Sequence, residues 1–281
     1  MKKRHSFAIF TLIFVAFLYS NHNSLVKNIK YYDWHYFDGF ISRNFINKEP
    51  QLTSILNVSQ RPNFDYSWLS RDEFIFISHR GGKYYQTGAN TKTTITDSLT
   101  KSSQFIEVDL ILDGEDIVCL SNEVFHDDSC DLNWIINLLI ENDFFLVIDI
   151  KSDVHDIDLY REFYEKIVES KNFSIIKNRI IPQAYNFQHL KILDQLDFSV
   201  GPIFTTYKTN IPFDLIYKHL PLFGVKVIAM PISEIKIIEN FQDGDFIYFT
   251  YPVTTHEELL LIEKSNIRGI YTPIFEELEI K

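Results

Sequence analysis

The sequence is poor in the residues that build several common kinds of site. Its 281 residues include two cysteines and nine glycines. Two cysteines cannot form a disulfide scaffold, and no Cys-x-x-Cys pair or Cys/His cluster predicts a zinc site. One bridge between Cys119 and Cys130 and two separate thiols are both left open. No GxGxxG or P-loop follows an apolar run, which disfavours nucleotide-binding doubly wound folds, and no GxSxG elbow predicts a serine hydrolase.

Positive charge is also in short supply. The chain has 27 lysines and arginines against 38 acidic residues, and its formal net charge is -11. A negative surface argues against nucleic acid or anionic lipid as the main partner, so no nucleic-acid partner is expected. Apolar residues make up 46% of the chain. This is a globular composition, sufficient for one large domain or two small ones.

The N-terminus carries a charged segment followed by an apolar run. Lys2, Lys3 and Arg4 precede FAIFTLIFVAFLY at 7–19, a run shorter than the roughly 20 residues of a bilayer span. This pattern is typical of a secretory signal. No Ala-x-Ala site or lipobox cysteine follows, so an uncleaved signal anchor stays open, and a buried N-terminal helix is the less favoured alternative. Both export readings place the rest of the chain outside the cytoplasm, at the periplasmic or extracellular face, and an anchor would attach it to the membrane.

Three segments are predicted along the chain. A signal peptide or anchor occupies 1–20, an aromatic-rich N-terminal extension without a clear motif occupies 21–72, and the main domain occupies 73–281. The extension is expected to pack on the main domain or to link it to the membrane.

In the main domain, apolar β-branched runs alternate with segments of helical periodicity. Strands are predicted at 75–79, 105–111, 144–151, 179–185, 199–207, 225–231, 245–251 and 268–272, with a short extra strand at 116–120. Helices are predicted at 93–102, 131–142, 156–170, 187–196, 211–220, 232–241 and 254–265. Such alternation means a parallel sheet, and eight units form either a closed (β/α)8 barrel or a large open sheet. The pattern alone does not select closure.

Acidic residues interrupt two of the predicted strands. Glu107 and Asp109 are two residues apart and therefore share one face of their strand. Two buried carboxylates on one face repel each other, so they indicate a cation site or a protonation role; the alternative is an exposed edge strand. Asp149 and Lys151 share a face in the same way, as an ion pair or as a third metal ligand beside a lysine that binds an anion. Three oxygen ligands suit Ca²⁺ or Mg²⁺ rather than zinc.

The first predicted strand ends in Ser78-His79-Arg80-Gly81-Gly82. Strands commonly stop at glycine, but α/β proteins also build sites where parallel strands end. Gln183 and Tyr185 end another strand in the same manner. Cations for a phosphate, acids for a divalent metal and a histidine for proton transfer together fit phosphodiester chemistry.

These motifs resemble those of a known superfamily. HRG, then ANT, FIEVDLILDGEDIV and LVIDIK, in this order over about 74–273, are similar to the glycerophosphodiester phosphodiesterase and phosphatidylinositol phospholipase C-like phosphodiesterases. IIPQAYN and GIYTP resemble a bacterial branch of them. The resemblance implies a (β/α)8 TIM barrel, here with an N-terminal extension.

The resemblance also implies roles for individual residues. His79 would be one of two catalytic histidines, and Arg80 and Lys151 would bind phosphate. The metal, Ca²⁺ or Mg²⁺, would be held by the acids Glu107, Asp109 and Asp149.

Two positions depart from the family pattern. Ala89 replaces the family's Glu before Asn-Thr, so one metal ligand is missing. Ser121 stands where the second catalytic histidine is expected, and serine is no general acid near neutral pH. His126 lies five residues further on and would need a local shift to take that role.

Two functions therefore remain open. The favoured one is a phosphoric diester hydrolase that cleaves a glycerophosphodiester or related small phosphodiester by metal-assisted acid/base catalysis. The other is a catalytically degenerate barrel that binds a phosphorylated lipid headgroup or glycan at the cell envelope. A purely structural barrel would explain an anchor but not the polar ensemble.

Overall fold

The structure is a computed structural model. It describes residues 62–69, 73–83, 88–120, 128–151, 156–206, 209, 211–238, 241, 246–262 and 265–273. The predicted signal segment and most of the predicted extension lie outside these residues. Within the described ranges, no helix is long and apolar enough to cross a membrane.

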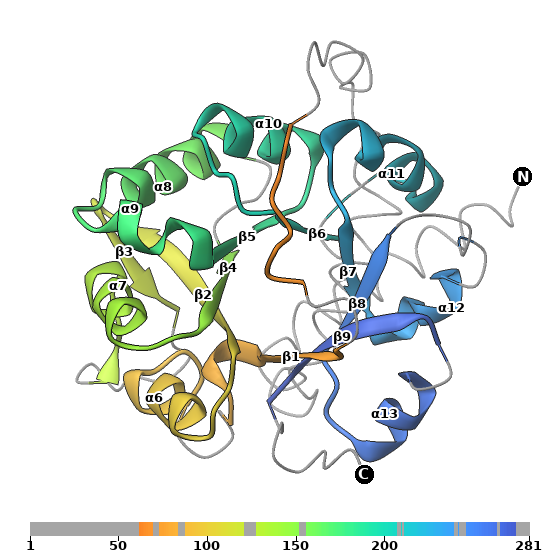
Figure 1. Ribbon diagram of the computed structural model, residues 1–281, viewed down its shortest axis with the longest axis horizontal. Coiled ribbons are helices and arrows are strands. Elements are labelled where there is room, and N and C mark those ends of the chain that lie inside the picture. The colour runs from red at the N-terminus through yellow and green to blue at the C-terminus, as the bar shows by residue number, and fades with distance from the viewer. Residues whose placement is uncertain are drawn as a thin grey trace, which may run out of the picture. The chain divides into compact units, whose positions relative to one another are not determined.

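Eight parallel strands form a closed barrel (Figure 1). They are β1 (Ile75–Ser78), β2 (Phe105–Asp113), β4 (Phe145–Ile150), β5 (Ile180–Ala184), β6 (Ile203–Thr205), β7 (Val227–Pro231), β8 (Ile247–Tyr251) and β9 (Ile267–Thr272). Strand β1 pairs with β9 on one side and with β2 on the other, where Ser78 lies opposite Ile106. This pairing closes the sheet and confirms the (β/α)8 barrel. The short β3 (Asp116–Cys119) is antiparallel to β2, as expected for the extra strand.

Helices surround the barrel and follow the predicted segments (Figure 1). They are α6 (Lys92–Thr100), α7 (Leu132–Glu141), α8 (Ile157–Glu169), α10 (Phe187–Gln195), α11 (Phe213–His219), α12 (Ile235–Ile238) and α13 (His256–Ile262). Side-chain oxygens of Thr91, Asp131, Asp156 and Asn186 cap four of them by accepting first-turn N–H groups. The four-residue α9 (Phe173–Ile176) was not predicted, since one turn is too short to show a period.

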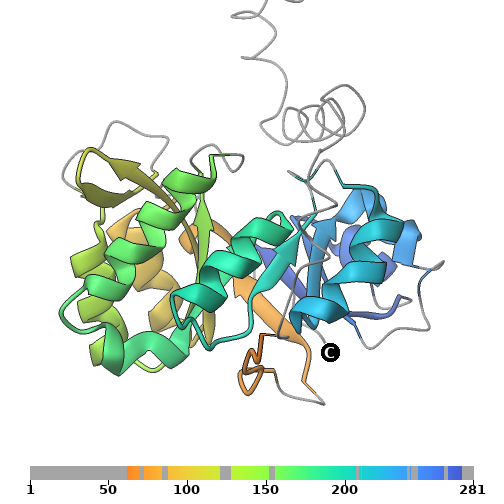
Figure 2. The same cartoon turned by 90° about the horizontal axis from the view of Figure 1, so that it is seen from above.

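Residues 62–69, here called the floor segment, lie across the N-terminal ends of the strands (orange in Figure 2). The Tyr66 hydroxyl donates to the Pro202 carbonyl over 2.9 Å and accepts the Lys226 N–H over 3.0 Å. The Trp68 indole donates to the Gly201 carbonyl and its ring meets that of Phe105 at 6.0 Å. These partners precede or begin their strands, so the floor segment packs against the N-terminal ends of the strands. It does not cover the C-terminal ends, where a site can form.

The floor segment also explains why β6 is shorter than predicted. The prediction of a strand over 199–207 is wrong at its N-terminal end, because the chain there pairs with the floor segment instead. The Asp65 N–H donates to the Ser199 carbonyl, and the Asp65 carbonyl accepts the Gly201 N–H, each over 2.6 Å. A Cβ added at Gly201 would lie 2.4 Å from the Tyr66 ring, so only glycine permits this close approach.

Cys119 of β3 and Cys130 form a disulfide, with their Cα atoms 5.2 Å apart. The Cys119 N–H also donates to the Cys130 carbonyl over 2.9 Å. This bridge closes the loop between β3 and α7 and decides between the two alternatives that the sequence left open.

The double substitution Cys119→Ser/Cys130→Ser is expected to lower the free energy of unfolding by about 3 kcal/mol, the chain-entropy value for a loop of this size. The cysteines are 11 residues apart in sequence. Equilibrium denaturation measures the change, and wild-type protein with a reductant serves as the control and should show a similar loss. A variant with the wild-type midpoint in the absence of reductant would contradict the prediction.

Candidate active site

The chain leaves β1 in a tight left-handed turn. His79, Arg80 and Gly81 form a single 3-10 turn, η1 (His79–Gly81), in which Arg80 has φ 55° and ψ 41°. Gly81 and Gly82 also have positive φ, and a Cβ on Gly82 would lie 1.9 Å from the Ser98 hydroxyl of α6. The glycines therefore let the backbone turn against α6. A left-handed non-glycine residue is strained, which is common where a site requires it.

This turn brings Arg80 back onto β2. Its backbone N–H donates to Glu107 Oε2 over 2.6 Å, and its Nε donates to Asp109 Oδ2 over 2.9 Å. Arg80 is buried, with 3% of its surface exposed. The arginine predicted to bind phosphate thus also holds the two acids of β2 in position.

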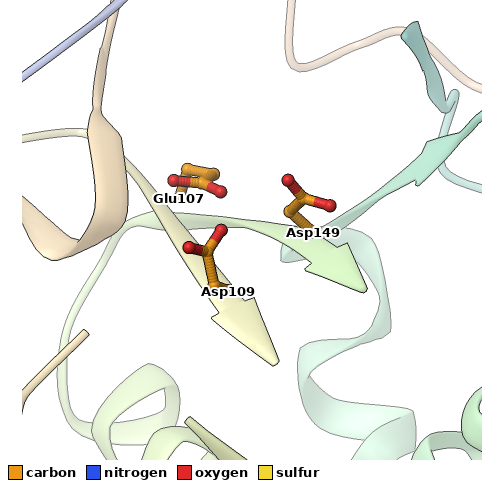
Figure 3. A group of neighbouring side chains, drawn as sticks. All are labelled: Glu107, Asp109 and Asp149. Atoms are coloured by element: carbon orange, nitrogen blue, oxygen red, sulfur yellow. The ribbon is translucent and has the colours of Figure 1, made fainter. Parts of the chain in front are cut away.

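The three predicted acids meet at one place (Figure 3). Glu107 and Asp109 come from β2, and Asp149 on the neighbouring β4 lies directly opposite Asp109 in the strand register. One carboxylate oxygen from each residue lies within 4.8 Å of the others. All three side chains are buried, so the alternative of an exposed edge strand is wrong. Three converging carboxylate oxygens could hold a hard divalent cation.

Lys151 supplies positive charge beside the acids. Its Nζ lies 3.0 Å from Asp109 Oδ1 and also pairs with Asp149 Oδ2. Burial alone raises the pKa of Asp109, but Lys151 and Arg80 outweigh burial and hold this pKa well below its usual range. Burial alone lowers the pKa of Lys151, yet Asp109 and Asp149 hold it above its usual value. Asp109 is therefore ionised and Lys151 is charged.

Glu107 behaves differently from Asp109. Burial raises its pKa well above the usual value, and repulsion from Asp109 raises it further. Of the two acids of β2, Glu107 is therefore the one whose neutral form is favoured, because the nearby cations mainly compensate Asp109. A divalent cation would supply the charge that Glu107 needs in order to ionise.

Three further residues lie beside the cluster; the sequence placed Tyr185 among the polar strand ends but assigned no site role to Asn90 or Tyr271. The Asn90 amide accepts the Asp109 N–H over 2.9 Å and donates to Asp109 Oδ2 over 3.1 Å. Its φ of 56° suits asparagine, and the ANT motif was the available signal. The Tyr185 hydroxyl donates to Asp149 Oδ1, and Tyr271 packs edge-on to His79 with ring centroids 6.3 Å apart.

The remaining predicted residues are placed as follows. His79 is half-buried at the end of β1, and its charge helps to lower the pKa of Asp109, after the effects of Lys151 and Arg80. Gln183 lies within β5, and its side-chain oxygen accepts a hydrogen bond from the Thr205 hydroxyl over 2.8 Å. Ser121 and His126 lie outside the described residues.

Solved structures share this barrel, although no family model and no curated protein matches the sequence. A putative glycerophosphoryl diester phosphodiesterase from Silicibacter pomeroyi is 12% identical with a TM-score of 0.60, covering 73% of this chain and 91% of its own. An Oleispira antarctica phosphodiesterase, solved with the product sn-glycerol-3-phosphate, is 12% identical with a TM-score of 0.59, covering 76% and 97%. A glycerophosphodiester phosphodiesterase from Thermotoga maritima is 16% identical with a TM-score of 0.54, covering 75% and 100%. The chain thus has the (β/α)8 fold of the glycerophosphodiester phosphodiesterases, which confirms the resemblance at the level of the fold.

Proposed function

We propose that this chain is a phosphoric diester hydrolase that cleaves a glycerophosphodiester or a related small phosphodiester. The observation that carries the proposal is the convergence of three buried carboxylates with Lys151, Arg80 and His79 at the C-terminal strand ends. A structural neighbour holds sn-glycerol-3-phosphate, which supports a phosphorylated ligand of similar size for this barrel.

The acids fit a divalent cation. Glu107, Asp109 and Asp149 offer only oxygen atoms, which suit Ca²⁺ or Mg²⁺. The raised pKa of Glu107 is consistent with a carboxylate whose counter-charge comes from a metal. When bound, such an ion would polarise the phosphoryl oxygens.

The chain's own residues supply the other parts of the reaction. His79 is the group that transfers a proton, because an imidazole exchanges protons near neutral pH. Lys151 and Arg80 provide the positive charge that attracts the phosphate, and both also fix Asp109. Asn90 and Tyr185 orient Asp109 and Asp149, respectively.

Metal removal tests this proposal. Full-length protein in detergent is expected to hydrolyse bis(p-nitrophenyl) phosphate or a glycerophosphodiester with Ca²⁺ or Mg²⁺, and to lose at least about 100-fold of its rate in EDTA, because the cation stabilises the charge of the transition state. Release of p-nitrophenol, or of the alcohol, measures the rate. Excess metal should restore it. A rate that EDTA leaves unchanged would contradict the metal-assisted reaction.

A second candidate function is a barrel that binds a phosphorylated headgroup or glycan without cleaving it. Arg80 and Lys151 already compensate two of the three acids, so the cluster does not depend on a metal for its charge balance. Ser121 at the position of the family's second histidine also favours this candidate. Phosphate binding without turnover of any tested diester would support it.

We also propose that the protein is exported. The charged and apolar N-terminal pattern supports export, and so does the disulfide between Cys119 and Cys130, because disulfides persist mainly outside the cytoplasm. An uncleaved apolar segment would then hold the barrel at the membrane.

A further inference from the structure

Tyr271 on β9 has a buried hydroxyl that bonds to none of the residues that the structure describes. Only 2% of the residue is exposed, and in the part of the chain that the structure describes its oxygen has no hydrogen-bond partner. Burying a hydroxyl without a partner is unfavourable, and most buried polar groups are paired. An unpaired hydroxyl near a candidate active site therefore calls for a ligand as its partner.

The ring of Tyr271 stands inside the barrel. It packs edge-on between Tyr251, at 5.7 Å, and His79, at 6.3 Å. Gly269 lies on the same face of β9, and a Cβ added there would lie 2.7 Å from the Phe249 ring, which in turn meets the Trp68 ring of the floor segment. This face of β9 therefore points into the interior, and Tyr271 lies further from the floor segment than Gly269 does.

The hydroxyl lies close to the acid cluster without bonding to it. Tyr271 packs on His79, and the next residue, Arg80, donates its backbone N–H to Glu107 Oε2 over 2.6 Å. In keeping with this placement, burial raises the pKa of Tyr271, and the charges of Glu107 and Asp149 raise it further. Neither carboxylate, however, is a hydrogen-bond partner of the hydroxyl. A protonated phenol beside His79 can donate one hydrogen bond, and among the described residues none supplies the acceptor.

We propose that the Tyr271 hydroxyl donates a hydrogen bond to a phosphoryl oxygen of the bound ligand, whose charge Arg80 and Lys151 attract. A bound divalent cation would not accept this bond, whereas an anionic phosphate oxygen is a strong acceptor. Tyr271 is thus a ligand-binding residue on the His79 side of the site. The inference deepens the proposed function and rests on it, since it requires a phosphate ester beside the cluster.

Substitution of Tyr271 by phenylalanine keeps the ring and removes only the hydroxyl. In the full-length protein with Ca²⁺, the Kd for inorganic phosphate and for glycerol 3-phosphate, measured by calorimetry, is expected to rise about tenfold. The Tm of the ligand-free variant should be equal to that of the wild type or higher, because no internal hydrogen bond is lost. A diester substrate, if it turns over, should lose kcat/KM by a similar factor.

Tyr248→Phe is the matched control. The Tyr248 hydroxyl on β8 donates to the Phe241 carbonyl over 3.0 Å, so this variant should lose thermal stability and keep its phosphate affinity. If Tyr271→Phe instead lowered the Tm and left the Kd unchanged, the hydroxyl would serve the stability of the fold. That result would overturn the role of Tyr271 in ligand binding and leave the proposed function standing. Wild-type protein that binds neither phosphate nor glycerol 3-phosphate would overturn the anion site itself, and with it both the inference and the proposed function.

Discussion

His79→Ala is expected to lower kcat for bis(p-nitrophenyl) phosphate by about 10²–10⁴-fold, the usual contribution of a positioned acid or base. His79 is the histidine that the described residues bring to the acid cluster. It is half-buried at the end of β1, so its removal leaves no buried charge unpaired and the fold should persist. Steady-state kinetics at saturating metal measure the effect.

His256→Ala provides a control, since His256 is exposed at the start of α13 and should change neither rate nor stability. If His79→Ala retained the wild-type rate, another group would transfer the proton. If the wild type itself showed no turnover above His79→Ala while binding phosphate, the barrel would be the binding protein of the second candidate function.

Asp109→Asn is expected to have the largest effect on stability, a loss of about 3–5 kcal/mol. The Asp109 carboxylate pairs with Arg80 Nε at 2.9 Å and with Lys151 Nζ at 3.0 Å. Removing its charge leaves the buried Arg80 and the partly buried Lys151 with one acid fewer, and removing one partner of a buried pair is strongly unfavourable. Denaturant unfolding measures the loss, and a calcium titration of the folded fraction should show weakened binding.

Two matched variants test whether the loss of stability comes from the charge of Asp109. Glu107→Gln should destabilise the metal-free protein much less than Asp109→Asn, because burial and Asp109 raise the pKa of Glu107 and so disfavour its charged form. Asp113→Asn, at the exposed end of the same strand, should stay within about 0.5 kcal/mol of the wild type. Equal stability for Asp109→Asn and Asp113→Asn would show that the ion pairs of Asp109 contribute little to the free energy of unfolding.

Local sequence pattern was sufficient for much of this barrel. The strands and helices follow from runs of β-branched residues and from helical periodicity, which are properties of neighbouring residues. The pairing of Glu107 with Asp109 on one face needs only the two-residue period of a strand. The same period placed Asp149 and Lys151 on one face of their strand, the end of the first apolar run singled out His79, and the resemblance then predicted a role for each.

The tertiary structure decided what depends on contacts between distant segments. Closure required β1 to pair with β2 as well as β9, and the length of β6 depended on the floor segment, which competes for its backbone hydrogen bonds. The register of β2 with β4 set Asp109 opposite Asp149. The positions of the Tyr271 hydroxyl and the Asn90 amide depend on contacts with residues far away in the sequence. Local periodicity does not predict such contacts, because it describes only neighbouring residues.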